Sequence, residues 1–284
     1  MTARLQDKVA VITGGCSGIG LETAQLFVSE GARVVIADIA EDVGRDLERR
    51  SPACLRFSKC DVTREEDVAA AVALAVREFG GLDITFNNAG ALCATDTIET
   101  IEAESWDYAI NLLLRGPLFG IKHSVGPMRA RGGGSIVNTS SISGVTTSGP
   151  VGYCVGKAGV IQLSRVAACQ LAPYNIRVNS LVPGLIPTPI FGTAFGMSRA
   201  ESERMVPVLS AGASTLQPLP RAGKARDIAE ACLFLSTEAG AFLTGTELRI
   251  DGGMTLMAQM NMENTQPGSV GSLIAAAVRE ARGS

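Results

Sequence analysis

The sequence predicts an α/β fold in which a parallel sheet is covered by helices on both faces. Short apolar, β-branched runs alternate along the chain with segments whose apolar residues recur at helical spacing. The runs are apolar almost throughout, as is typical of strands buried on both faces. A glycine-rich turn joins the first run to the first helical segment. With 284 residues and 46% hydrophobic content, the chain can bury the core of one large domain.

The first half of the chain is predicted to hold four strands and the helices between them. Helix 65–78 shows the helical spacing most clearly, because its apolar residues recur every three or four positions. The strands are placed at 8–13, 33–38, 54–58 and 82–86, and the helices at 21–28, about 41–50 and 65–78.

The second half adds three strands, which brings the sheet to about seven. The strands are placed at 134–140, 176–182 and 247–250, and the helices at about 104–111, 152–172 and 227–235. Residues 185–220 are rich in Pro, Gly, Phe and Met and follow the carboxyl end of a strand, where ligands bind in open α/β sheets. We therefore interpret 185–220 as a mobile substrate lid. Its apolar side chains are Ile190, Phe191, Phe195, Met197, Met205 and Val208.

The tail differs in character from the rest of the chain, so residues 1–256 are assigned to one domain and 257–284 to a C-terminal extension. Methionines gather at 254, 257, 260 and 262, and an apolar stripe at 270–281 predicts an amphipathic helix. This helix can pack on its own subunit, on a neighbouring subunit or over the mouth of the site. A frayed tail is the alternative.

Composition argues against several classes of function. The net charge is −3 without a basic block, which argues against nucleic-acid binding, and no apolar run reaches the length of a membrane span. The N-terminus has no signal-peptide core, and seven cysteines without a CxxC pair favour the reducing cytoplasm. The single histidine, His123, leaves no cluster for a zinc site and no triad. We expect it on a helix surface.

The glycine turn indicates a dinucleotide site, because it follows a strand and opens a helix. Gly14 permits the tight turn, Gly18 lets a diphosphate approach the backbone, and Gly20 lets helix and strand pack closely. The helix N-terminus then faces the phosphates. The spacing alone is weak evidence, and an ordinary strand–helix turn is the alternative.

An acid at the end of the second strand predicts the cofactor preference. Asp38 can accept hydrogen bonds from ribose hydroxyls and repels a 2′-phosphate, which favours NAD over NADP. Neither Cys16 nor Ile39 brings a compensating charge, and Arg33 should point away. Asp61, after the third strand, suits an adenine contact, a cap for the helix beginning near residue 64, or both.

Tyr153 and Lys157 are four residues apart and therefore share one face of their predicted helix. Ser141 lies upstream at a predicted strand end. Asn111 lies within the predicted helix of about 104–111, where asparagine is unfavourable, so its carbonyl or amide is a candidate to hold a water molecule.

Together these motifs resemble the short-chain dehydrogenase/reductase family over roughly residues 5–256. The matching pieces are Thr13-Gly14-x3-Gly18-Ile19-Gly20, Asp38, Asp61-Val62, Asn87-Asn88-Ala89-Gly90, Asn111, Ser141, Tyr153-x3-Lys157 and Pro183-Gly184-x-Ile186-x-Thr188. The resemblance implies a single Rossmann-type, doubly wound domain with seven parallel strands, in a homotetramer.

Two features depart from the family pattern. Ser141 precedes Tyr153 by 12 residues where the family often has 13, a spacing that Ser140 would give. We nevertheless assign Ser141, with Ser140 and Ser143 as alternatives. The tail after residue 256 is the second departure.

The resemblance implies a role for each motif residue. Tyr153 would be the general acid/base, which requires its pKa to fall about three units, or roughly 4 kcal/mol. Lys157 and a positive nicotinamide would supply this, while Lys157 also binds the nicotinamide ribose. Ser141 would hold the substrate oxygen, and Asn111 a relay water. The cofactor-binding set would be Gly14, Ser17, Gly18, Ile19, Gly20, Asp38, Asp61, Val62, Asn88, Ala89, Gly90, Tyr153, Lys157, Pro183, Gly184, Ile186 and Thr188, with Ile186 and Thr188 fixing the carboxamide and no metal.

The substrate is predicted less directly. The apolar lid suits a secondary alcohol or ketone of steroid, terpenoid or aryl type, whereas an acidic substrate would need Arg199 or Arg204 as a clamp. The alternatives are an NADPH-linked ketoacyl reductase and a catalytically silent dinucleotide-binding protein. A phosphate-transferring ATPase is excluded, because no Gly-Lys-Ser/Thr follows the glycine turn.

Overall fold

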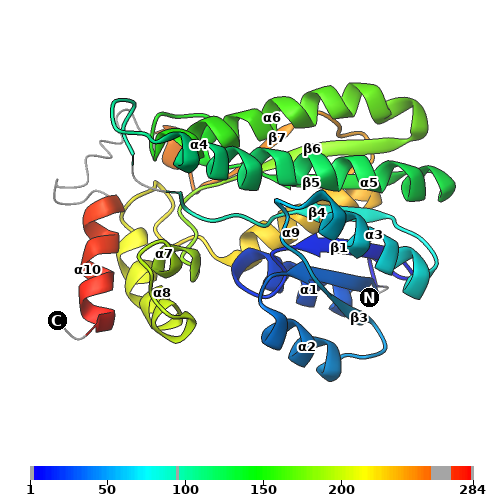
Figure 1. The fold of residues 1–284 in the computed structure, drawn as a ribbon, viewed down its shortest axis with the longest axis horizontal. Helices are drawn as coiled ribbons and strands as arrows, with labels where there is room; N and C mark the ends of the chain where they lie inside the picture. The colour runs from blue at the N-terminus through cyan, green and yellow to red at the C-terminus, as the bar shows by residue number, and fades with distance from the viewer. Residues whose placement is uncertain (1–2, 94–95, 257–269, 283–284) are drawn as a thin grey trace.

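The structure is a computed structural model that describes residues 3–93, 96–256 and 270–282 (Figure 1). Within these residues seven strands form one sheet, all parallel, in the order β3-β2-β1-β4-β5-β6-β7. The predicted fold class is therefore confirmed. The strands are β1 (Val9–Thr13), β2 (Arg33–Asp38), β3 (Leu55–Lys59), β4 (Ile84–Asn87), β5 (Gly134–Thr139), β6 (Ile176–Pro183) and β7 (Glu247–Ile250).

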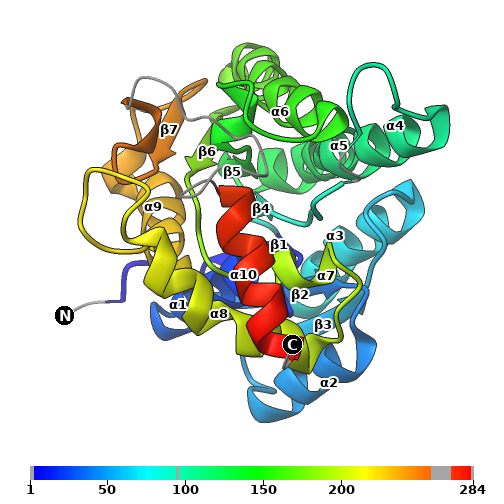
Figure 2. The same ribbon diagram turned by 90° about the vertical axis from the view of Figure 1, so that its left-hand side faces the viewer.

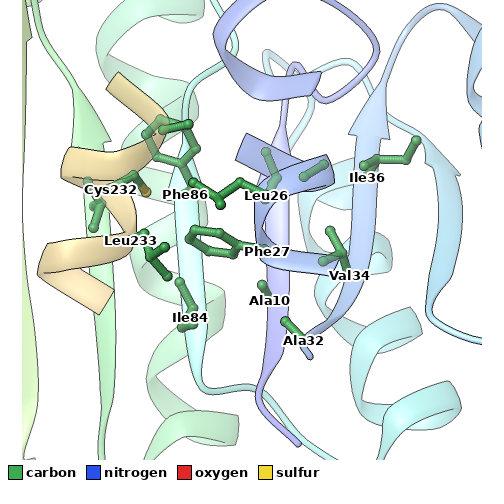
Figure 3. Packing of buried hydrophobic residues seen from close by; sticks show 14 of the residues in the cluster. Ala10, Leu26, Phe27, Ala32, Val34, Ile36, Ile84, Phe86, Cys232 and Leu233 are labelled. Carbon is green, nitrogen blue, oxygen red and sulfur yellow. The ribbon is translucent and has the colours of Figure 1, made fainter. Parts of the chain in front are cut away.

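Helices cover both faces of the sheet (Figure 1). One face carries α1 (Gly18–Ser29), α2 (Glu41–Arg50) and α9 (Ala225–Ser236). The other carries α3 (Glu65–Phe79), α5 (Gly116–Ala130) and α6 (Val151–Leu171). The core on the first face centres on Phe27 of α1, which lies between the sheet residues Ala10 and Ile84 and Leu233 of α9 (Figure 3).

The strand order places a switch point between β1 and β4. The chain leaves β1 toward β2 and β3 on one side and resumes at β4 on the other, so the loops after β1 and β4 diverge. The register aligns the carboxyl ends of these strands, since Ile12 lies opposite Phe86 and Asn87 lies opposite Asn138. Open α/β sheets bind ligands in the crevice at such a point.

Among the described residues, α5, α7 (Ile190–Thr193) and α8 (Arg199–Ala213) lie outside the helix ranges that the sequence analysis assigned, although His123 of α5 was expected on a helix surface. Helix α5 follows α4 (Ala103–Ile110) through a π-helical segment, Asn111–Arg115. Asn111 therefore does not sit in the middle of a regular helix. It begins a wider turn of the kind found often at functional sites. Helix α8 occupies much of the predicted lid, and the short α7 precedes it.

The C-terminal helix α10 (Val270–Arg282) packs on α8 of its own chain (Figure 2). Of the three arrangements considered for the tail, the structure has the first. The contact buries Ile274 and Ala277, and Arg282 donates a 3.1 Å hydrogen bond to the carbonyl of Phe195. The predicted methionine patch lies outside the described residues except for Met254, which is buried. None of the helices described is long and apolar enough to cross a membrane.

Candidate active site

A cavity of about 990 Å³ opens at the carboxyl ends of the strands, around the switch point. It brings together residues from most of the length of the chain. Of the predicted site residues, those lining it are Gly14, Ser17, Gly18, Ile19, Asp38, Asp61, Val62, Asn88, Ala89, Gly90, Asn111, Ser141, Tyr153, Lys157, Pro183, Gly184, Ile186 and Thr188. Gly20 is the exception. A Cβ there would overlap the carbonyl oxygen of Gly14, so Gly20 permits close packing behind the cavity.

The glycine turn forms one wall of the cavity. Gly18 has φ +50°, and a Cβ on it would lie 3.2 Å from Cβ of Thr188, so the backbone comes close to the start of the lid. Ser17 is the N-cap of α1, and its side chain makes no capping hydrogen bond. The N-terminus of α1 is therefore not capped by Ser17, and its first residues, Gly18 and Ile19, line the cavity, where an anion such as a diphosphate could accept from their N–H groups.

Asp38 occupies the far end of this wall. Its carboxylate accepts hydrogen bonds from the backbone N–H of Cys16 at 2.9 Å and of Ala40 at 3.0 Å. Arg33 points away, as predicted, and pairs with Asp7. Asp61 lines the cavity but does not cap α3. Its carboxylate accepts from the N–H and hydroxyl of Thr63 instead, so the predicted cap is wrong.

Thr13 opens the quoted glycine motif, but the sequence analysis gave it no role in the site. Its hydroxyl accepts hydrogen bonds from the N–H groups of Asn88 and Ala89, both at 3.0 Å. The Asn88 side chain in turn donates to the carbonyl of Thr13 at 3.2 Å. These bonds join the ends of β1 and β4, and so fix the width of the cavity at the switch point.

Tyr153, Ser141 and Lys157 meet on the opposite wall. Ser141 and Tyr153 are joined by a side-chain hydrogen bond. The Nζ of Lys157 donates to the carbonyl of Thr139 at 2.7 Å and lies 5.7 Å from the centre of the Tyr153 ring. The hydroxyl of Ser140 donates instead to the carbonyl of Lys157 at 2.7 Å, deep in the protein. The geometry therefore favours Ser141 over Ser140 as the serine beside the tyrosine.

The protein's own groups do not acidify the phenol. Burial raises the pKa of Tyr153 to about 12, and the hydrogen bond from Ser141 offsets this only in part. Burial also lowers the pKa of Lys157 to about 8, since its ammonium has lost water. The predicted fall in the pKa of Tyr153 is therefore not found for the protein alone. The bond to Thr139 holds the Nζ of Lys157 near the phenol ring, 5.7 Å from its centre.

Asn111 and His123 differ in how they relate to the site. Asn111 lines the cavity, and its side-chain oxygen accepts a 3.2 Å hydrogen bond from Arg115. The backbone carbonyl of Asn111 is also engaged, because it accepts a hydrogen bond from the N–H of Gly116 in the π-helical turn. His123 lies on α5, partly exposed and 3.0 Å from Glu65, away from the cavity. Among the residues described, no cluster of His, Cys, Asp and Glu could hold a metal ion.

The lid contributes differently from what its composition suggested. Ile190 and Phe191 line the cavity, together with Leu92, Tyr108 and Leu112. The other lid residues predicted to contact substrate do not line it. Met197 and Met205 are buried with Val208 between α8 and α10, and Phe195 is half exposed. The apolar face of α8 thus packs on the C-terminal helix and not on a ligand.

The residues of the cavity fit a dinucleotide. The wall at Gly14–Gly20 presents an open helix N-terminus, Asp38 presents carboxylate oxygens beside it, and Tyr153 and Lys157 face the opposite end. Phosphate, ribose hydroxyl and a reacting carbon each find a group of suitable chemistry along one continuous cavity.

Comparisons with known proteins agree with this geometry. A family model described as enoyl-(acyl carrier protein) reductase matches residues 14–255. Short-chain dehydrogenase reductase 4 of Arabidopsis thaliana is 38% identical over 90% of this chain and 85% of its own length.

The names of two bacterial relatives describe dehydrogenases of ring alcohols. Trans-4-hydroxycyclohexanecarboxylate dehydrogenase of Sinomonas cyclohexanicum is 38% identical, over 89% of this chain and 94% of its own. 2,5-Dichloro-2,5-cyclohexadiene-1,4-diol dehydrogenase of Sphingobium indicum is 36% identical, over 88% of this chain and 98% of its own. The chain therefore belongs to the short-chain dehydrogenase/reductase family, whose members are oxidoreductases that use nicotinamide dinucleotides.

Proposed function

We propose that this protein is an NAD-dependent dehydrogenase that interconverts an uncharged, apolar secondary alcohol, carried on a ring, and its ketone. The observation that carries the proposal is that Tyr153, Ser141 and Lys157 line the same cavity as the glycine turn and Asp38. The ring preference is supported by the two bacterial relatives, whose names describe ring alcohols.

In the proposed reaction the chain supplies proton transfer and position. Ser141 orients the substrate oxygen toward Tyr153, and the phenolate form of Tyr153 takes the hydroxyl proton as the alcohol is oxidised. A bound nicotinamide would supply the hydride acceptor, and its positive charge would favour the phenolate that the protein alone disfavours. Lys157, anchored on Thr139, holds its ammonium near the phenol ring and would bind the nicotinamide ribose. Asn111 extends the proton path toward solvent through a water.

The charges of the cavity support an uncharged substrate. Its described cationic residues are Lys157, which is bonded to Thr139, and Arg199, which is bonded to Cys16 beside Asp38. Arg204 is exposed and does not line the cavity. Neither candidate clamp therefore lies at the tyrosine end, where a carboxylate substrate would need one. No Lys or Arg occurs in the residues that the structure does not describe, which are 1–2, 94–95, 257–269 and 283–284.

A screen of ring alcohols tests this proposal. NAD⁺ reduction would be followed with cyclohexanol, larger apolar ring alcohols and trans-4-hydroxycyclohexanecarboxylate. We expect the uncharged alcohols to have the higher kcat/KM. A preference for the carboxylate would contradict the assignment of an uncharged substrate, and lack of turnover across the panel would favour a catalytically silent dinucleotide-binding protein.

Asp38 is expected to set the preference for NADH over NADPH. Replacing it by serine removes the charge that opposes a 2′-phosphate and keeps an acceptor for Cys16. We expect Asp38→Ser to narrow the ratio of the two dissociation constants by about tenfold, corresponding to roughly 1.4 kcal/mol. Fluorescence titration with each cofactor measures it. A wild type that prefers NADPH would contradict the assignment of Asp38 and support the ketoacyl-reductase alternative.

The exposed faces of α5 and α6 support the proposed homotetramer. Leu118, Val155 and Val166 are each more than two-fifths exposed on these helices, as apolar side chains in a subunit interface would be in an isolated chain. Light scattering in solution tests this, with a mass four times that of the chain expected.

A further inference from the structure

Arg199 reaches the cofactor half of the cavity from the lid. It is the first residue of α8, and its Nη2 donates a 3.3 Å hydrogen bond to the carbonyl of Cys16 in the glycine turn, 183 positions earlier in the chain. Cys16 is also the residue whose N–H binds Asp38. The guanidinium therefore lies between the ribose end of the cavity and the N-terminus of α1.

The surrounding contacts hold this side chain in place. Nε of Arg199 donates to Glu203 at 2.9 Å, one turn further along α8. Ser198 and Glu201 close the N-terminus of α8 in a reciprocal capping box, which fixes the helix at its first residue. Within residues 3–93, 96–256 and 270–282, no hydrogen bond engages Nη1, and the residue lines the cavity.

We propose that Arg199 is a cofactor-binding residue that donates to the diphosphate of the dinucleotide and thereby couples the lid to cofactor binding. The N-terminus of α1 at Gly18 marks where the diphosphate lies, and Thr188 at the start of the lid approaches Gly18 directly. A guanidinium is a strong donor to phosphate oxygens. A 2′-phosphate is the weaker alternative, because it would lie against the carboxylate of Asp38 at Cys16.

This inference rests on the proposed function, since it takes the cavity as the dinucleotide site. Sequence reasoning offered Arg199 as a clamp for an acidic substrate. The structure instead places it at the glycine turn, so its charge serves the cofactor and not the reacting end. The lid is then held to the cofactor by the contact between Arg199 and the diphosphate. Because every dinucleotide of this class carries a diphosphate, the contact does not depend on the substrate.

Binding measurements on purified protein test the proposal. Calorimetry would give dissociation constants of NADH, NADPH, ADP-ribose and adenosine for the wild type, Arg199→Ala, Arg199→Lys and the control Arg204→Ala, which removes an exposed arginine of the same helix. We expect Arg199→Ala to weaken NADH, NADPH and ADP-ribose by the same factor, about tenfold or more for a charged hydrogen bond. Adenosine should be unaffected, Arg199→Lys should recover part of the loss, and Arg204→Ala should match the wild type.

Hydrogen exchange supplies a readout that is independent of affinity. Saturating ADP-ribose should slow amide exchange in α8 of the wild type, and should not do so in Arg199→Ala. Unchanged dissociation constants in Arg199→Ala, with or without a lower melting temperature, would overturn the proposal, as would a loss confined to NADPH. Failure of the wild type to bind either NADH or ADP-ribose would instead overturn the assignment of the cavity itself.

Discussion

Replacing Tyr153 by phenylalanine is expected to lower kcat about a thousandfold, within the range contributed by general acid–base catalysis. The change removes one oxygen, which hydrogen-bonds Ser141 and is the proposed acceptor of the substrate proton. The ring that lines the cavity remains, so NADH binding should change little. Initial rates of NAD⁺ reduction with a ring alcohol, and fluorescence titration with NADH, measure the two effects.

Tyr174→Phe is the matched control for this substitution. Tyr174 is partly exposed, with the guanidinium of Arg129 4.0 Å above its ring, and lies outside the cavity. Its variant should keep the full rate. If Tyr153→Phe retained even a tenth of the wild-type kcat, another group would have to carry the proton.

Substituting Lys157 by methionine is expected to reduce kcat by about a hundredfold, since electrostatic support of a developing charge typically contributes on this scale. Methionine fills a similar volume but cannot donate to Thr139 or place a charge beside Tyr153. Lys122→Met, on the exposed surface of α5 where it pairs with Glu65, provides the control. Equal rates for the two variants would contradict a catalytic role for Lys157.

The stability of the Lys157→Met variant provides a second measure of the buried charge. Burial lowers the pKa of Lys157 from 10.5 in its ordinary state to about 8 in the fold. Between these values the unfolded chain binds more protons, so the free energy of unfolding of the wild type rises with pH. The rise amounts to at most about 3 kcal/mol and should be missing from the variant. Urea unfolding at pH 8 and 10 measures the difference. If the free energy of unfolding changed with pH equally in the wild type and in Lys157→Met, the pKa of Lys157 would not be lowered by burial.

The fold was predictable because local and global signals agree in most elements. Apolar runs such as 33–38 are buried on both faces, and their boundaries in the structure differ from the prediction by only one or two residues. The range of helix α5 was not predicted, because its sequence contains three glycines and two prolines, which are unfavourable in helices. The Ser198–Glu201 capping box is a sequence signal for the start of helix α8. It was not used in the prediction, because the surrounding segment is rich in Pro and Gly.

The site was predictable as a set of motifs but not as a set of contacts. Tyr153 and Lys157 are one helical turn apart, so their proximity follows from sequence alone. The bond between Arg199 and Cys16 joins residues 183 positions apart in the chain, and it requires the packed position of α8 beside the glycine turn. No periodicity encodes such a contact. The pKa of Tyr153 likewise depends on burial, which the spacing of residues does not reveal.

The account depends on hydrogen passing from an alcohol carbon to the nicotinamide within the cavity where Tyr153 lies. Incubation of the protein with NAD⁺ and cyclohexanol deuterated at its carbinol carbon, followed by mass spectrometry of the NADH formed, tests this most directly. We predict NADH that carries one deuterium on a single face of the nicotinamide. NADH without deuterium, or with deuterium on both faces, would contradict the account.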